Sequence, residues 1–289
     1  QAEIDAVVIA SPTYLHARHI GAAFDAGLHA LCASPVGVNS REASHAVTSA
    51  GLVGKTFMYS NPLRFDPRIA GAREIVASGE LGEILHASVC IQISDWPHEP
   101  SSWRLDRERG GGATLVAGLQ ALDALWYAID CPEPMEAMAA SYDHFSRQRA
   151  DASFELIAED LLAGTVRFKN GSSLQLNAQI NAPLGGEAQR LSLRATGTRG
   201  SLDATEGECC LADSPQPRRY GEASSAVELH MAEARAFLHA IESQEEPPAT
   251  GKQALALSKM TDALLESGRE KEAVAIKVER SLDDLFGAL

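Results

Sequence analysis

The hydrophobic period changes once along this 289-residue chain, and that change constrains the fold more than any other feature. Up to about residue 62, short apolar runs at residues 4–10, 28–33 and 55–60 alternate with helical patterns. Runs of this kind are typical of strands that are buried on both faces. Because strands and helices alternate, we expect a parallel sheet with helices packed on it.

From about residue 84 the period becomes two. Apolar and polar residues alternate through 88–93, 162–169 and 173–180, as in antiparallel strands with one covered and one polar face. The sequence therefore predicts an α/β plus α+β fold. Residues 1–62 would form part of a Rossmann-like parallel sheet, and residues 63–289 a domain built on an open, mostly antiparallel sheet with covering helices.

Local signals predict where several elements begin. Ser225 with Glu228, and Thr250 with Gln253, have the spacing of capping boxes at the starts of two late helices. A further helix is expected over residues 113–129, directly after three glycines. The stretch at 213–226 is rich in Ser, Glu and Pro, and it predicts a loop.

The acidic composition limits the classes of partner. The chain has 25 Lys+Arg and 39 Asp+Glu, which gives a net charge of −14, whereas nucleic acids and anionic membranes attract clustered basic residues. No apolar run approaches the roughly 18–20 residues that a membrane helix needs. The five cysteines are odd in number and scattered, without a CxxC pair, which favours free thiols in a reducing cytoplasm.

Six segments in this order resemble one protein family. They are VVIASPTYLH, AAFDAGLHALCASPVGVN, YSNPLRFDP, SGELGEI, SSWR and RGGGATLVAGLQALD. The series is similar to the glucose–fructose oxidoreductase/inositol dehydrogenase/rhizopine-catabolism (Gfo/Idh/MocA) family. The resemblance implies hydride transfer between NAD or NADP and a sugar, cyclitol or related polyol.

The family's glycine loop, GxGxxG after the first strand, is not found in this sequence. By resemblance, residues 4–10 match the fourth strand of the nucleotide fold, which pairs with the first strand. A missing βαβαβ half is roughly 60 residues long, and without it residues 7–9 would lie on an uncovered edge. The chain begins with Gln1. We therefore expect either a longer natural chain or a shortened protein whose edge a partner covers.

The resemblance also implies roles for individual residues. Those expected to line the cofactor are Ser11, Pro12, Leu15, His16, Pro35, Trp103 and Arg104, and those expected to face substrate are Asn61, Arg64 and Asp123. Each has a structural alternative. His16 could simply pack, Arg64 and Arg104 could form structural ion pairs, and Asp123 could face solvent or cap a neighbour. No pattern of metal ligands is present.

The expected catalytic positions depart from the family. Ala33-Ser34-Pro35 stands where the family usually has Glu-Lys-Pro, and Val116 and Gln120 replace the Asp and His of an Asp-x-x-x-His pair. Ser34, Val116 and Gln120 cannot accept a proton near neutral pH, and loss of general acid–base help typically costs about 10²–10⁴ in rate. We therefore expect weak or altered activity. The alternatives are a catalytically silent binding or regulatory relative, or a product without function.

One strand face is polar but uncharged. It carries Gln175, Asn177, Gln179 and Asn181. By resemblance we expect a homo-oligomer that pairs through this antiparallel sheet, with a plain solvated face as the alternative.

Overall fold

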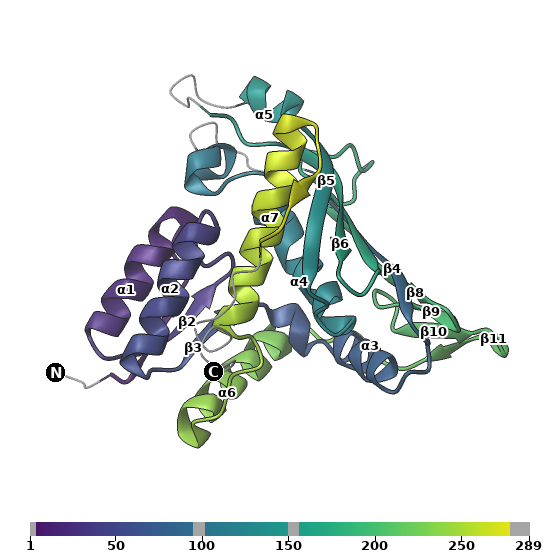
Figure 1. Ribbon diagram of the computed structural model, residues 1–289, viewed down its shortest axis with the longest axis horizontal. Helices are drawn as coiled ribbons and strands as arrows, with labels where there is room; N and C mark the ends of the chain where they lie inside the picture. Colours follow the sequence, from purple (N-terminus) through teal and green to yellow (C-terminus); the bar gives the residue numbers. More distant parts are fainter. Residues whose placement is uncertain (1–3, 95–101, 150–155, 278–289) are drawn as a thin grey trace, which may run out of the picture.

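A small parallel sheet opens the computed structural model, which describes residues 4–94, 102–149 and 156–277 (Figure 1). Its order is β1–β2–β3, and its strands are β1 (Ala6–Ile9), β2 (His29–Ala33) and β3 (Phe57–Ser60). Helices α1 (His16–Asp25) and α2 (Ser40–Val53) connect these strands and lie side by side against the sheet. The continuous apolar runs predicted this arrangement, because a strand covered by helices can be apolar throughout.

The first strand is an edge strand. Val8 is 71% exposed on one face of β1, whereas Ile9 points to the other face and is buried. Residues 7–11 line an apolar groove together with Ala22, Ala23 and Leu28. Among the described residues, β1 pairs with β2 alone, so no strand lies beside its other edge.

The second sheet is much larger, with the order β11–β10–β9–β8–β4–β7–β6–β5–β12. Its strands are β4 (Ile84–Ile93), β5 (Pro134–Tyr142), β6 (Leu161–Phe168), β7 (Ser173–Gln179), β8 (Gln189–Gly197), β9 (Gly200–Asp203), β10 (Glu208–Leu211), β11 (Ser214–Arg219) and β12 (Val274–Ala275). The β4–β7 pair is parallel, and the remaining neighbours are antiparallel. This confirms a mostly antiparallel sheet, in which β6 and β7 pair as a hairpin.

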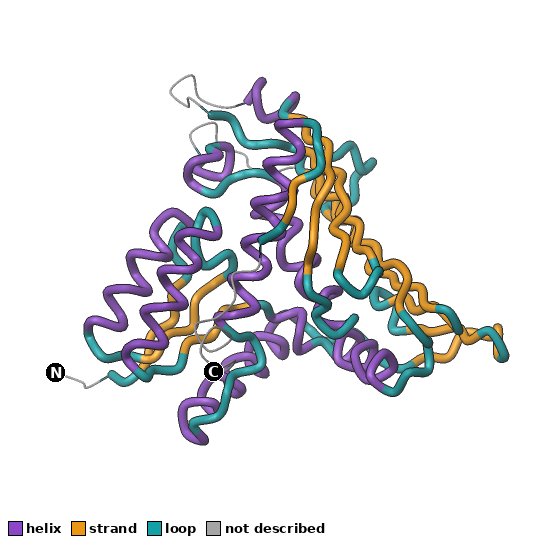
Figure 2. Tube along the Cα trace, in the orientation of Figure 1, coloured by secondary structure: helices purple, strands orange, loops and turns teal. Residues whose placement is uncertain are grey.

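Two helices cover the apolar face of this sheet. They are α4 (Leu119–Ala128), which lies against β4 and β8, and α7 (Gly251–Glu270), which lies against β5 and β6. Leu162, Val166 and Leu176 are fully buried beneath them. Figure 2 shows the strands grouped in two separate regions with helices between them, and α7 also contacts α2 of the small unit.

The outer face of the large sheet follows the predicted alternation with one exception. Gln175 is exposed there, and Gln179 accepts a 3.1 Å hydrogen bond from Gln92 on the neighbouring strand. Asn181 does not belong to this open face, because it is buried and adopts a φ of +59° just after β7 ends. A turn residue in the left-handed region leaves the period-two pattern of the strand.

The remaining helices are α3 (Pro67–Ala77), α5 (His144–Arg149) and α6 (Ala226–Ser243). Both predicted capping boxes are present at the starts of α6 and α7. The predicted helix over 113–129 is more complex, since a π-helical turn (Thr114–Gly118) precedes α4. Among the described residues, no helix combines the length and the apolar character that a bilayer crossing requires.

The predicted loop at 213–226 is wrong for six of its fourteen residues. Residues 214–219 form β11, an edge strand that pairs with β10. Its prolines lack an N–H group, which is tolerated at a sheet edge because one side of the strand needs no ladder partner. Proline content therefore indicated an edge and not the absence of a strand.

Candidate functional site

Three loops meet at the carboxyl edge of the small sheet. The strand ends lie level, because Ile9 pairs with Cys32 and Ala33 pairs with Ser60. The residues that follow are Ser11–Pro12, Ser34–Pro35 and Asn61–Pro62, and the Ser34–Pro35 peptide bond is cis. Open α/β sheets bind ligands at this edge, so these loops define the candidate site.

His16 lies beneath two of these loops. It is 2% exposed, and its Nδ1 and Nε2 lie 2.7 and 2.6 Å from the backbone carbonyl oxygens of Pro35 and Ser11. The sequence predicted that His16 lines the cofactor. In the structure both of its ring nitrogens are already used by the loops, so it holds their shape and offers no polar atom to a ligand.

Ser34 has an unusual hydroxyl. Its Oγ is buried and has no hydrogen-bond partner among the described residues. A buried hydroxyl without a partner costs free energy, so such an atom indicates a place where a ligand or water binds. Ser11 differs, because its Oγ lies 2.9 Å from Nδ1 of His19. Pro12 and Leu15 are half-buried in the same turn, where the Leu15 N–H donates to the Pro12 carbonyl.

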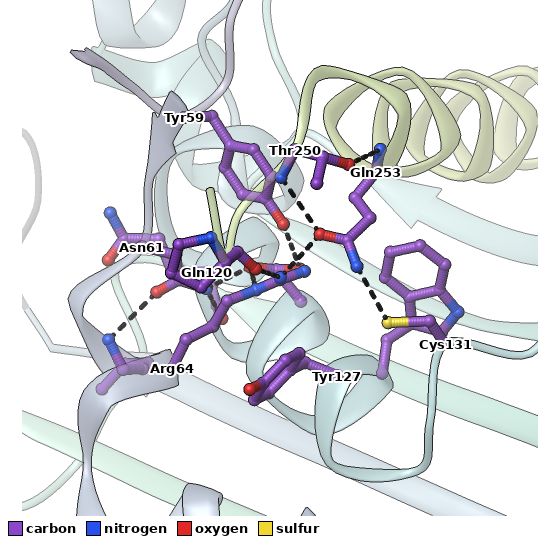
Figure 3. A network of polar contacts seen from close by, with 12 residues as sticks. Tyr59, Asn61, Arg64, Gln120, Tyr127, Cys131, Thr250 and Gln253 are labelled. Carbon is purple, nitrogen blue, oxygen red and sulfur yellow. Dashed lines mark hydrogen bonds and ion pairs between the residues drawn. The ribbon is translucent and has the colours of Figure 1, made fainter. Parts of the chain in front are cut away.

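The three predicted substrate residues form an internal network instead. Figure 3 shows Asn61 and Arg64 within it. Arg64 donates from Nε and Nη2 to the two carboxylate oxygens of Asp123, at 2.9 and 2.6 Å, and both side chains are 1% exposed. Asn61 Nδ2 donates to the same carboxylate at 2.6 Å. The ion-pair alternative therefore describes Arg64, and a substrate could reach these groups only after a rearrangement.

Other members of this network were not predicted as a cluster. Arg64 Nη1 donates to Gln253 Oε1 at 2.9 Å, and the guanidinium lies 4.5 Å from the Tyr127 ring centre and 5.1 Å from that of Tyr59. Tyr59 donates to Asp123 at 2.9 Å. These contacts join β3, α4 and α7, and sequence periodicity contains no signal for such long-range polar partners.

The environment fixes the charges in this network. Burial by itself would lower the pKa of Arg64, but the Asp123 carboxylate raises it above its ordinary value. Burial and the same carboxylate raise the pKa of Tyr59 well above the usual range. Tyr59 therefore stays neutral near pH 7 and keeps the proton that it donates to Asp123.

Gln120 lies on the same side of the molecule as Ser34. Its backbone carbonyl accepts from Asn61 Nδ2 at 2.9 Å, and Asn61 follows Ser60, the strand partner of Ala33. The Gln120 side chain itself is exposed. Val116 lies in the π-helical turn just before it. The structure thus brings the altered positions Ser34 and Gln120 to one region.

Aromatic and basic side chains flank the first loop. Trp103 and Tyr14 form an edge-to-face pair with ring centres 6.4 Å apart. The Arg104 guanidinium lies 4.7 Å from the Trp103 ring centre, and that of Arg109 lies 5.5 Å from the Tyr14 ring centre. Tyr14, which stands between Pro12 and His16, was not among the residues that the sequence predicted for this region.

A buried carboxyl group supports the glycine turn before α4. Glu159 Oε1 accepts from the Thr114 N–H at 2.9 Å, and burial raises the pKa of Glu159. A Cβ at Gly112 would lie 2.4 Å from this carboxyl group, so position 112 requires glycine. In the described part of the chain, no three His, Cys, Asp or Glu side chains could together hold a metal ion.

The geometry defines a two-part α/β protein whose small parallel sheet has the form of a dinucleotide-binding sheet. A family model described as the oxidoreductase family with an NAD-binding Rossmann fold matches residues 1–60. A second model, the GFO/IDH/MocA C-terminal domain, matches residues 69–203. The chain belongs to the Gfo/Idh/MocA family.

Several proteins are similar over most of the chain. A 1,5-anhydro-D-fructose reductase from Ensifer adhaerens is 28% identical over 86% of this chain and 73% of its own length. A D-xylose 1-dehydrogenase (NADP(+)) from Haloferax volcanii is 24% identical over 94% of this chain and 81% of its own. The structure of a levoglucosan dehydrogenase with NADH and levoglucosan superposes with a TM-score of 0.82, at 22% identity, covering 96% of this chain and 81% of the other.

Proposed function

We propose that this chain belongs to an NAD(P)-linked oxidoreductase that acts on a sugar or related polyol. The observation that carries this proposal is the buried, unpartnered Ser34 hydroxyl between the strand-end loops, on the side where Gln120 is exposed. Family membership and the similar sugar reductase and dehydrogenase support the reaction class.

The residues present fit the nicotinamide and ribose end of a dinucleotide. Ser11, Pro12, Leu15 and Pro35 would surround it, and Trp103 with Arg104 would lie beside the first loop. When bound, the dinucleotide supplies or accepts the hydride. The GxGxxG loop that would hold a pyrophosphate is not in this sequence, so we assign no residue of this chain to that group.

Within the site, Ser34 and Gln120 would bind and orient the polyol. A hydroxyl and an amide donate and accept hydrogen bonds, but neither has a pKa suited to taking the proton that leaves an alcohol. Asn61, Arg64 and Asp123 would not contact the polyol. Asn61 would hold the backbone carbonyl of Gln120 in place, and Asp123 with Arg64 would hold Asn61. We therefore propose tight orientation of substrate with slow proton transfer.

The test is fluorescence titration with NADH and NADPH, followed by a turnover screen over sugars and cyclitols. The variant Ser34→Lys/Gln120→His should raise kcat by about 10²-fold or more, because it supplies groups that can accept the proton. Binding that is unaffected by Ser34→Ala and Gln120→Ala would contradict this site.

A second candidate is a binding protein without turnover. The specific observation that favours it is the simultaneous presence of Ser34, Val116 and Gln120 at the expected proton-handling positions. It predicts cofactor and polyol binding in titrations, with no product from any substrate in the screen. Turnover by the unmodified protein would reject it.

We also propose that two copies pair through the outer face of the large sheet. Support comes from Met138 and Tyr142, which are large and exposed on β5; Met138 pairs with Thr165 of β6, which in turn pairs with Gln175 of β7. Light scattering should give a dimer mass, and Met138→Glu should give a monomer.

The free thiols of all five cysteines support a reducing cytoplasm as the location.

A further inference from the structure

His16 makes two hydrogen bonds that impose a protonation state. Nδ1 and Nε2 lie 2.7 and 2.6 Å from the backbone carbonyl oxygens of Pro35 and Ser11. A carbonyl oxygen only accepts hydrogen bonds, and a neutral imidazole has only one N–H group. In the neutral ring, one nitrogen lone pair would therefore face a carbonyl lone pair in a buried place. Both contacts are favourable only when both ring nitrogens carry a proton.

The surroundings of this ring contain opposing influences. His16 is the first residue of α1, where the exposed N–H groups of the helix disfavour a cation. The two carbonyls oppose this effect at direct contact distance, whereas the helix dipole acts over a turn. Since both ring nitrogens bind carbonyls, His16 makes no ion pair with a carboxylate in the described residues. Its charge would thus be compensated only by backbone dipoles.

We propose that His16 is an imidazolium that clamps the Ser11 and Pro35 loops, and that its charge makes the site prefer the reduced cofactor. The second part rests on the proposed function, which puts the nicotinamide against these two loops. The oxidised nicotinamide ring carries a positive charge, and the reduced ring is neutral. A buried cation next to this position would repel the oxidised form, so the site would favour binding NADH or NADPH and working as a reductase.

The first experiment examines the protonation state in the protein without cofactor. Protein labelled with ¹⁵N-histidine is compared with His16→Gln, which identifies the His16 signals among the nine histidines. His16→Asn is the second variant in case the first does not fold. We expect both ring nitrogens of His16 at the chemical shifts of protonated nitrogens at pH 7. One protonated and one unprotonated nitrogen would overturn the clamp.

The second experiment measures dissociation constants for NADH and NAD⁺, and for NADPH and NADP⁺, by calorimetry. Glutamine keeps a donor but removes the charge, so His16→Gln should reduce the preference for the reduced form by about tenfold, mainly by improving binding of the oxidised form. His45→Gln, at an exposed position on α2, is the matched control and should leave this ratio unchanged.

The two experiments separate the possible failures. An unchanged ratio in His16→Gln, with normal binding of both forms, would overturn the proposed preference. If no dinucleotide binds to the unmodified protein, the proposed function fails and the preference fails with it, while the ¹⁵N experiment still decides the clamp. A merely structural role for His16 would weaken both cofactor forms equally, and that result would also reject the charge effect.

Discussion

The two sheets of this molecule differ in how far other elements cover them. In the large sheet, α4 and α7 cover the apolar face of the central strands, and Leu162, Leu174 and Leu176 are fully buried. In the small sheet, β1 has an open edge, and Val8 is 71% exposed. In the described residues, the two sheets therefore differ in how much of their apolar surface other elements cover.

A buried polar network joins these two regions. Asp123 lies on α4, while its partners Tyr59, Asn61 and Arg64 lie on β3 or directly after it. Because the Arg64–Asp123 ion pair is fully buried, removal of either partner would leave the other charge buried and uncompensated. We call this network, formed by Tyr59, Asn61, Arg64 and Asp123, the junction between the two regions. Mutations in it test how strongly the two regions depend on each other.

The largest effect is expected at this junction. Asp123→Ala leaves the Arg64 charge buried without its partner, and it should lower the free energy of unfolding by about 3–5 kcal/mol in urea titrations. Arg64→Met/Asp123→Leu should recover part of this loss, because it removes both charges. Glu187→Ala breaks an exposed pair with Arg190 and serves as the control, with no measurable change expected. A similar loss of unfolding free energy in Asp123→Ala and Glu187→Ala would contradict the argument that burial makes the Arg64–Asp123 pair important.

A second pair of variants compares the sheets directly. Leu176→Ala removes a fully buried side chain from the large sheet and should cost about 2–5 kcal/mol. Val8→Ala removes an exposed side chain from the small sheet and should change stability by less than about 0.5 kcal/mol. Urea titrations of both variants measure the contrast. A large loss for Val8→Ala would mean that the edge is covered in solution.

A third pair tests two glycines, one in each region. Gly112→Ala should destabilise by about 1–3 kcal/mol, because φ is +102° and the new Cβ would collide with Glu159. Gly21 lies in α1 with open space around its Cβ position, so Gly21→Ala should stabilise by up to about 1 kcal/mol. Thermal melts followed by circular dichroism decide both. Equal effects would show that the turn before α4 tolerates a side chain.

The smallest effect on stability is expected for Val8→Lys. A charge on an open strand edge hinders pairing with other chains while leaving the fold intact. The free energy of unfolding should change by less than about 0.5 kcal/mol. Light scattering should show less self-association at high protein concentration. Increased aggregation or a large loss of stability would show that this edge has a partner.

The sequence predicted most of the local structure. Its two periods gave the parallel and the antiparallel sheets, and the capping boxes at Ser225 and Thr250 located the starts of α6 and α7. These successes share a cause, because periodicity and caps report burial and hydrogen bonding within a few residues.

The tertiary structure decided which groups meet. Arg64 and Asp123 are 59 positions apart, and nothing in either segment indicates that each neutralises the other. Likewise, only the fold places the Pro35 and Ser11 carbonyls on the two nitrogens of His16, and only the edge position allows β11 to contain prolines. A polar side chain looks the same in sequence whether it faces a substrate or a buried partner. Its role depends on distances between distant segments, and those are fixed only when the chain is packed.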